Sequence, residues 1–469
     1  MPMKDYRTGR VIRLATTAAL GGLLFGWDSA VINGATSAIK ETFNLGSFAI
    51  GLVVSIALIG SAVGAWFTGS LADRFGRRPV MLIAAVMFFI ASIGQGFPIG
   101  VYDLILWRLI GGAAIGVASV AAPMYISETA PAQIRGRMAS LQQFAIVIGI
   151  FLTGLVNYLI LNAAGGNSLN PWLLGLPAWR WMFLALSVPA VIYFVLALRI
   201  PESPRWLVAK GRVDAARGVL QQIYTNDVAP LLKEIQDSLS GKSPSLRDLR
   251  GSRFGLAPIV WIGIILSVLQ QFVGINAVFY YSNTIWESVG FSENQAFLTS
   301  LITTAVNVAF TIVAIALIDR IGRKPLLIVG SIGMLVTLAI LTWVFGTAPV
   351  GADGNPILND GPDIVAVLSF NVYVAFFAAT WGPVVWVLLG EIFPNRMRAV
   401  ALAVAAAAQW IANFIVSTTF PTLASTSLAL AYGIFTVFAA LSIPFVMRKI
   451  HETKGVQLEE IEALEASSR

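Results

Sequence analysis

The chain has 469 residues, of which 57% are hydrophobic and 12% are charged, whereas a soluble globular protein carries roughly 25% charged residues. A chain this apolar needs lipid to cover it, which excludes a soluble protein. The net charge of +7 is carried mainly by short loops between apolar runs, which excludes a nucleic-acid-binding protein. Cysteine is absent and His451 is the single histidine, which excludes a disulfide framework and Ser-His-Asp catalysis and predicts that no metal or cofactor is used.

Twelve apolar runs follow one another along the chain, each long enough to cross a bilayer, which takes about 20 residues. In chain order they cover residues 11–33, 48–72, 79–97, 103–126, 138–162, 179–199, 256–280, 295–318, 325–346, 363–389, 399–421 and 428–448. The pattern predicts an all-α polytopic membrane protein. The first run is too long for the apolar region of a removable signal peptide.

One long polar stretch, residues 201–255, separates the runs into two sets of six. It carries many charges with helical periodicity, which predicts short surface helices. The predicted parts are a six-helix bundle at 1–200, linker helices at 201–255, a second bundle at 256–450 and a tail at 451–469.

Lys and Arg gather in alternate loops, which predicts the orientation in the membrane. The loops rich in Lys and Arg are 73–78, 129–137, 201–255, 319–324 and 391–398, and Lys and Arg also follow one another at the start of the C-terminus, at 448–449. Cytoplasmic loops carry such an excess, so both termini are predicted to be cytoplasmic. Short loops and the absence of any N-x-Ser/Thr sequence favour a bacterial inner membrane.

The two halves repeat short charged motifs at corresponding places. DRFGRRP (73–79) recurs as DRIGRKP (319–325), the pair Glu128 and Arg135 recurs as Glu391 and Arg398, and PESP (201–204) recurs as HETK (451–454). Parallel repeats are a transporter architecture with the substrate site between the halves. A duplicated channel is the alternative, but no repeated pore loop is visible.

With these motifs the chain resembles a sugar porter of the major facilitator superfamily. The matching stretches are GSLADRFGRR (69–78), RLIGGAAIGVAS (108–119), PMYISETAPAQIRG (123–136), PESPRWL (201–207), QQFVGIN (270–276), DRIGRK (319–324), WGPVVWVLLGEIFP (381–394) and AAQWIAN (407–413). The resemblance implies two pseudo-symmetric six-helix bundles that work by alternating access. HETKG (451–455) departs from the PETKG of the family, so His451 predicts a softer end to the last span.

The charged motifs form a predicted cytoplasmic belt with two interpretations. The belt either fixes orientation, with solvated partners, or acts as a gate whose carboxylates and guanidiniums pair across the halves when the inner side closes. A network contributes more than an isolated exposed pair, and the repetition favours the gate. Its candidates are Asp73, Arg77, Glu128, Arg135, Glu202, Asp319, Arg323, Glu391, Arg398 and Glu452.

Amides and tryptophans inside the apolar runs are candidates for binding a sugar. Asn and Gln both donate and accept hydrogen bonds, and a tryptophan stacks on the C–H face of a sugar. Gly274 and Gly382-Pro383 predict helix breaks, where transporters place their sites. The alternative for each amide is an interhelical hydrogen bond that only holds the bundle together.

The family resemblance narrows these candidates. The sugar contacts that it implies are Gln143, Gln270, Gln271, Asn276, Asn307, Trp386 and Gln409, with Phe25, Tyr280 and Trp410 in addition. Gln142 and Asn371 match no family contact and are interpreted as structural. Ile150, two turns beyond Gln143, predicts an apolar wall for the extra carbon of a hexose and so favours glucose.

Asp28 and Arg108 place opposite charges at matching depth in the first and fourth runs, which predicts that they pair. The pair is either static or a proton switch, in which Asp28 is ionised beside Arg108 and protonated away from it. Intramembrane carboxylates are functional by default. The resemblance agrees, because proton-coupled sugar porters have Asp and Arg at these positions and facilitative relatives lack the Asp.

The predicted function is secondary active uptake of a monosaccharide, glucose, by proton symport. The first alternative is a facilitative sugar carrier, which differs in whether Asp28 titrates. A transporter-like sugar sensor is disfavoured because only about 20 residues follow the last run, and an enzyme because no catalytic constellation is visible. The expected partners are sugar, proton and lipid, and the chain is expected to be a monomer.

Overall fold

The computed structural model describes residues 6–131, 133–238, 249, 251, 255–351, 356–358, 361–394 and 397–454. Twelve helical stretches within them are long and apolar enough to cross a membrane, which confirms the predicted all-α polytopic fold. The helices are α1 (Thr8–Thr42), α2 (Ser47–Phe75), α3 (Arg77–Gly96), α4 (Val101–Thr129), α5 (Arg135–Ala163), η1 (Leu173–Gly175), α6 (Ala178–Leu184), α7 (Ser187–Leu198), α8 (Pro204–Ala209), α9 (Val213–Ile223), α10 (Ala229–Ser238), α11 (Pro258–Phe272), α12 (Ile275–Ser288), α13 (Glu293–Ile321), α14 (Arg323–Thr347), α15 (Pro362–Ala379), α16 (Trp381–Ile392), α17 (Arg398–Thr426) and α18 (Leu428–Lys449).

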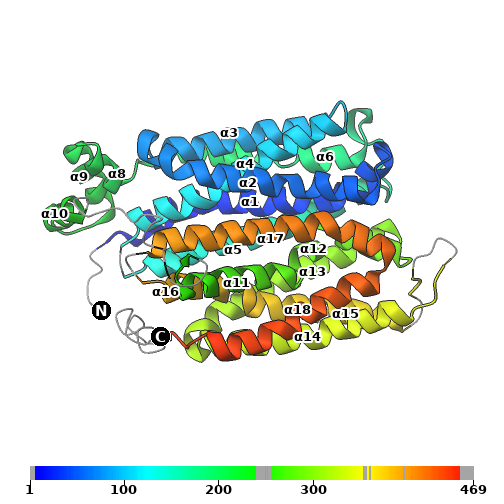
Figure 1. Cartoon of the computed structure of the whole chain (residues 1–469). Helices are drawn as coiled ribbons and strands as arrows, with labels where there is room; N and C mark the ends of the chain where they lie inside the picture. The colour runs from blue at the N-terminus through cyan, green and yellow to red at the C-terminus, as the bar shows by residue number, and fades with distance from the viewer. Residues whose placement is uncertain are drawn as a thin grey trace. The chain divides into compact units, whose positions relative to one another are not determined.

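Contacts divide the chain into two units. The first comprises Met1–Ile32, Ile56–Ile160 and Leu169–Ser243, and the second comprises Asn33–Ser55, Leu161–Ser168 and Pro244–Arg469. In the first unit α3 packs on α4, α6 and α7, and in the second α14 packs on α15 and α18 while α11 packs on α17 (Figure 1). In each unit we call the end at the DRFGRR or DRIGRK motif the belt end, and the opposite end the far end.

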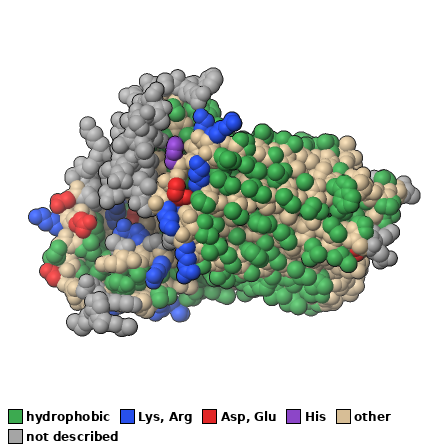
Figure 2. All heavy atoms as spheres, turned by 90° about the horizontal axis from the view of Figure 1, so that it is seen from below, with side chains coloured by type: hydrophobic (Ala, Val, Ile, Leu, Met, Phe, Trp, Pro, Cys, Tyr) green, Lys and Arg blue, Asp and Glu red, His purple; other side chains and the backbone are tan. Residues whose placement is uncertain are grey.

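The surface of the helices is apolar, as a lipid environment requires. Hydrophobic side chains cover the helical wall in Figure 2, and Lys and Arg form a band at one end of it. Trp66, Trp343 and Ile411 are 76%, 65% and 61% exposed. Large apolar side chains in such numbers would drive aggregation in water, so this wall suits the bilayer core.

The described part of the polar linker forms short helices, as its periodicity predicts. α8, α9 and α10 pack on one another within the first unit (Figure 1). α8 begins at Pro204, and the Ser203 hydroxyl caps it by accepting a hydrogen bond from the Trp206 N–H at 3.3 Å. Proline suits the first helical position because no partner exists there for an N–H.

The seventh span is broken at Gly274, as predicted. α11 ends at Phe272, and Gly274 adopts a left-handed conformation with φ of 89° before α12 begins. A side chain here would also collide with Phe435, since a Cβ would lie 2.3 Å from its ring. The Tyr373 hydroxyl donates to the Val273 carbonyl at the break, 2.7 Å away.

The tenth span is also broken, two residues earlier than predicted. α15 ends at Ala379, Thr380 has φ of −135° and ψ of −86°, and α16 begins at Trp381. Pro383 therefore lies in the first turn of α16, where a helix has no partner for an N–H. The proline is compatible with the new helix and does not itself form the break.

The last helix ends before the histidine that departs from the family motif. α18 stops at Lys449 and Ile450 is extended, so the end of the helix precedes His451. The stop is thus in place without a proline at 451, and the softer end expected from the sequence is not observed.

Candidate functional site

Four of the predicted sugar-binding amides form one hydrogen-bonded cluster in the second unit. Gln409 Nε2 donates to Gln270 Oε1 at 2.8 Å, and Gln271 Nε2 donates to the same oxygen at 3.4 Å. Asn276 Nδ2 donates to Gln271 Oε1 at 2.5 Å. The cluster joins α11, α12 and α17, so residues 139 positions apart in the chain, Gln270 and Gln409, come into contact.

The amide cluster lies where the two broken spans meet. Gln270 Nε2 donates to the carbonyls of Trp381 and Gly382, at 2.8 and 3.3 Å, in the first turn of α16. Gln270 and Gln271 stand on the last turn of α11, and Asn276 follows the break at Gly274. Both breaks therefore contribute to one polar centre inside apolar helices, which is how transporters build substrate sites.

The cluster retains hydrogen-bonding capacity for a ligand. Gln270 and Gln271 are buried, whereas Asn276 and Gln409 are half-buried. Gln409 Oε1 is buried and accepts no hydrogen bond from the described residues. An unpaired acceptor in such a place costs about 1–3 kcal/mol, and a hydroxyl donor would remove that cost.

The other predicted sugar contacts are distributed around both units. Trp386 on α16 is 40% exposed and Trp410 on α17 is half-buried, so both indole side chains are partly accessible. Tyr280 on α12 and Asn307 on α13 are buried. Phe25 on α1 and Gln143 on α5 belong to the first unit and are half-buried.

The two amides interpreted as structural have no part in this cluster. Asn371 Nδ2 donates to the carbonyl of Val367 on its own helix at 2.8 Å. Gln142 packs against Gly22, where a Cβ would lie 2.9 Å from its amide carbon. Both are therefore matched controls for substitutions in the amide cluster.

Asp28 and Arg108 come together inside the first unit, as their depth in the sequence predicts. Arg108 Nη1 lies 3.9 Å from Asp28 Oδ2, and the two residues are 2% and 0% exposed. The same nitrogen donates to the Asp28 backbone carbonyl at 3.3 Å. The pair is buried but loose, because the charged atoms stand beyond hydrogen-bond distance.

Gln95 is a third member of this group that the sequence analysis missed. It stands on the last turn of α3, is fully buried, and donates from Nε2 to Asp28 Oδ1 at 3.4 Å. Its Oε1 accepts from Arg108 Nη1 at 3.5 Å. The available signal was that Gln95 is the only amide in the third apolar run.

The charged belt of the first unit is an interlocked set of contacts. Arg77 forms a bidentate pair with Glu128, with both distances 2.9 Å, and its Nη1 lies 3.2 Å from Asp73. The Ser203 hydroxyl donates to Glu128 at 2.5 Å. Glu202 accepts from the Arg77 backbone N–H at 2.9 Å, so the start of α8 is tied to the start of α3.

The second unit repeats this arrangement. Arg323 forms a bidentate pair with Glu391 at 3.0 and 2.8 Å, and the Thr453 hydroxyl donates to Glu391 at 2.6 Å. Glu452 accepts from the Arg323 backbone N–H at 3.0 Å. Thr453 therefore replaces Ser203, and the sequence repeat is a structural repeat within each unit. Pairing across the halves stays a prediction.

Two further belt candidates, Arg135 and Arg398, are less engaged. Arg135 is exposed at the start of α5. Arg398 Nε donates to the Phe393 carbonyl at 3.1 Å, while its Nη2 is buried without a partner among the described residues. The side chain of Asp319 lies outside the described part of the chain.

The two capping carboxylates differ in pKa. Burial raises the pKa of Glu202 above its usual value, despite the backbone N–H groups that it accepts from. Burial would also raise the pKa of Glu452, but four backbone N–H groups outweigh it and hold that pKa below the usual value. Hydrogen bonds to the ionised form and burial act in opposite directions.

Glu452→Gln is expected to lower the thermal stability at neutral pH by about 1–2 °C. Because the pKa of Glu452 is lowered on folding, its stabilisation is present above the usual value of 4.5 and is lost as the pH falls. The difference in melting temperature should thus shrink towards pH 4. Glu202→Gln is the control. Because the pKa of Glu202 is raised on folding, the wild-type protein should lose stability relative to this variant as the pH rises. Parallel pH profiles for the two variants would contradict this account.

Polar contacts at the far end of the second unit were not foreseen from the sequence. Asn33 Nδ2 donates to Ser282 Oγ at 2.9 Å, and Ser37 Oγ donates to Glu287 Oε2 at 2.6 Å. Ser55 Oγ lies 2.7 Å from the hydroxyl of Thr418. The C-terminal part of α1 therefore contacts α12, and the N-terminal part of α2 contacts α17. Both parts belong to the first half of the sequence.

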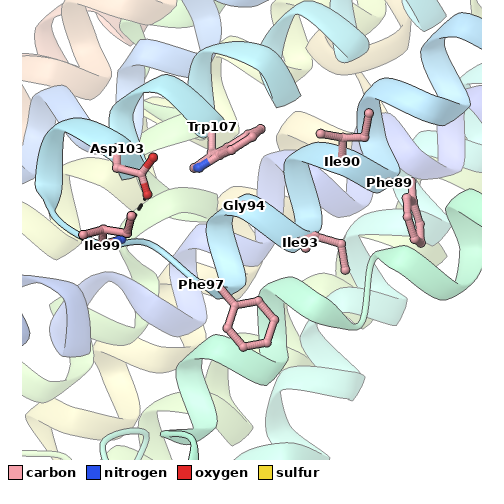
Figure 3. A pocket seen from close by; sticks show the side chains of 8 residues that line it. All are labelled: Phe89, Ile90, Ile93, Gly94, Phe97, Ile99, Asp103 and Trp107. Carbon is pink, nitrogen blue, oxygen red and sulfur yellow. Dashed lines mark hydrogen bonds between the residues drawn. The ribbon is translucent and has the colours of Figure 1, made fainter.

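A surface pocket in the first unit has an almost wholly apolar lining. It has a volume of about 360 Å³ and lies between α3 and α4 (Figure 3). Its lining is Phe89, Ile90, Ile93, Gly94, Phe97, Ile99, Asp103 and Trp107. Asp103 is the single charged group there, and its carboxylate accepts from the Ile99 N–H at 3.0 Å. The apolar wall suits lipid chains.

A metal site is not formed within the described chain, where no three His, Cys, Asp or Glu side chains come together suitably. The amide cluster can form hydrogen bonds with an uncharged polar ligand, and the buried Asp28 carboxylate can bind a proton. Both occur inside helices of membrane-spanning length.

The chain is similar over almost its whole length to proteins of known family. The family model described as "Sugar (and other) transporter" matches residues 14–464. A glucose transport protein of Synechocystis sp. is 52% identical over 453 residues, covering 96% of this chain and 97% of that protein. The D-xylose-proton symporter of Escherichia coli (strain K12) is 40% identical, covering 98% of this chain and 96% of that protein.

Solved structures agree with the sequence comparison. The xylose transporter XylE from E. coli in an inward-open conformation matches with a TM-score of 0.81 and 38% identity, covering 97% of this chain and 99% of that chain. The major facilitator superfamily proton:xylose symporter XylE bound to 6-bromo-6-deoxy-D-glucose matches with a TM-score of 0.78 and 39% identity, covering 98% and 100%. The chain therefore belongs to the family of sugar (and other) transporters.

Proposed function

We propose that this protein takes up a monosaccharide, glucose, together with a proton. The observation that carries the proposal is the combination of an amide cluster at two helix breaks with a buried Asp28–Arg108 pair. The relative that is 52% identical is named for glucose, and the symporter from E. coli is named for xylose and proton. The proposed sugar follows the more similar of these two relatives.

The sugar binds at the amide cluster in this proposal. Gln409 Oε1 accepts a hydrogen bond from a sugar hydroxyl, and the half-buried amide of Asn276 provides a second hydrogen-bonding group. Gln270 and Gln271 hold these two amides in place. Trp386 and Trp410 supply ring faces for the C–H side of the sugar, and Gln143, Asn307, Phe25 and Tyr280 complete the proposed contacts.

Asp28 carries the proton in this proposal. Beside Arg108 the carboxylate is ionised, and when the guanidinium moves away a proton takes its place. Burying an ion without its partner is costly, so Asp28 binds a proton before it separates from Arg108. Sugar movement and proton movement become coupled when the same helix motion changes both sites.

Alternating access would break contacts at one end and form them at the other. Opening the far end requires separation of Asn33 from Ser282 and of Ser37 from Glu287. At the belt end, Arg77 with Glu128 and Arg323 with Glu391 form two fixed charged groups. We propose that these groups meet when the inner side is closed, which makes the belt a gate.

The belt end is cytoplasmic in this proposal, with both termini inside a bacterial inner membrane. Two bundles, 1–200 and 256–450, are joined by the linker 201–255 and followed by the tail 451–469, and the chain works as a monomer. A cysteine at the exposed Asn167, in a chain without native cysteine, should react with an impermeant reagent only from outside the cell. Labelling only from inside would reverse the orientation.

Uptake of labelled sugars by proteoliposomes tests the proposed function. With an inward proton gradient, glucose should accumulate above equilibrium, and a protonophore should reduce it to equilibration. Galactose, xylose and arabinose should compete more weakly. Glucose uptake that reaches only equilibrium under both conditions would identify a facilitative carrier, and a failure to transport any of these sugars would refute the sugar site.

A further inference from the structure

The side-chain amide of Gln95 forms a hydrogen bond with each member of the Asp28–Arg108 pair. Nε2 donates to Asp28 Oδ1 and Oε1 accepts from Arg108 Nη1, at 3.4 and 3.5 Å. Arg108 Nη1 also donates to the Asp28 backbone carbonyl at 3.3 Å, and it stands 3.9 Å from Asp28 Oδ2. Asp28 Oδ2 itself accepts no hydrogen bond from the described residues and is buried.

A glycine on α4 leaves room for the side-chain amide of Gln95. Gly111, one turn beyond Arg108 on α4, has no side chain, and a Cβ there would lie 2.9 Å from Gln95 Nε2 and 3.1 Å from Asp28 Oδ2. On α5, Asn157 and Thr153 donate to α1 backbone carbonyls. Among the described residues near Asp28, the charged group that faces it is therefore Arg108, and α3 and α5 contribute neutral ones.

We propose that Gln95 is a positioning residue of the proton-coupling step, which holds the ion pair loose. The inference rests on the proposed role of Asp28. A proton from water binds Asp28 Oδ2 and the carboxyl becomes neutral, while Arg108 keeps its charge and continues to donate to Gln95 Oε1. The amide thus accepts from the guanidinium in both protonation states, so this hydrogen bond of the buried charge is kept when Asp28 becomes neutral.

Gln95→Met tests this by removing the donor and the acceptor at similar volume. Arg108 should then close on Asp28 Oδ2, and a proton would have to displace a complete salt bridge. The midpoint of the pH dependence of gradient-driven uptake should move about one unit to lower pH, a tenfold change in proton concentration. Sugar counterflow should stay within about twofold of wild type, because the amide cluster is unchanged. Gln95→Leu should give the same shift and serves if the Met variant does not fold.

Gln142→Met is the matched control, since it removes a buried amide of the same unit that forms no hydrogen bond with Asp28 or Arg108. Its pH midpoint should equal that of wild type. An unchanged midpoint in folded Gln95→Met, or a shift to higher pH, would overturn the inference while Asp28→Asn still uncouples transport. If Asp28→Asn retained accumulation, the proposed function and this inference would fail together.

Discussion

Asp28→Asn should abolish accumulation of glucose against its gradient while sugar exchange continues. The neutral amide imitates a permanently protonated carboxyl, so no proton is released in the cycle. Asp28 makes no hydrogen bond to the amide cluster and belongs to the first unit, whereas the cluster belongs to the second, so sugar affinity should stay within about twofold. Gradient-driven uptake and counterflow in the same liposomes measure the two effects separately.

The control for Asp28→Asn is Asp103→Asn. Asp103 is a carboxylate of the same unit on the first turn of α4, and it accepts from the Ile99 N–H. Its substitution should leave accumulation intact. Loss of both counterflow and accumulation in Asp28→Asn would make the Asp28–Arg108 pair structural. Accumulation equal to wild type would remove Asp28 from the coupling mechanism.

Asn276→Ala and Gln409→Ala should each weaken glucose binding by roughly 5- to 150-fold. The reason is that a sugar hydroxyl loses its partner, which typically costs about 1–3 kcal/mol. Gln270→Ala should have an effect at least as large, because Gln270 Oε1 accepts from both Gln409 and Gln271. Binding is measured on purified protein by titration calorimetry.

Asn371→Ala and Gln142→Ala are the controls for these substitutions. Asn371 bonds to its own helix, and Gln142 packs against Gly22. Neither should change the affinity by more than about twofold. Wild-type affinity in all three variants of the amide cluster would place the sugar elsewhere in the protein.

The membrane spans and one helix break were predictable because their causes are local. An apolar run long enough for a bilayer identifies a span without any partner. Gly274 lies between polar residues in such a run, and its left-handed conformation is one that other residues rarely adopt. The break at Thr380 was predicted two residues too late, at Gly382-Pro383. Pro383 looked like its cause, but the proline fits the first turn of α16.

Partnerships across long sequence distances were only partly predictable. The four amides were identified as candidates, but their hydrogen bonds depend on how α11, α12 and α17 pack. Gln95 was missed because its role appears only when α1, α3 and α4 place three side chains together. The contacts of Ser37 with Glu287 and of Asn33 with Ser282 join residues about 250 positions apart, and no local pattern marks them.

Sugar-driven proton movement tests the central claim most directly. Proteoliposomes in a weakly buffered medium receive glucose outside, with no initial pH gradient, and the external pH is recorded. The account predicts that the medium becomes more alkaline as glucose enters, and that Asp28→Asn takes up glucose with no change in pH. Glucose entry through the wild-type protein with no change in external pH would contradict proton coupling.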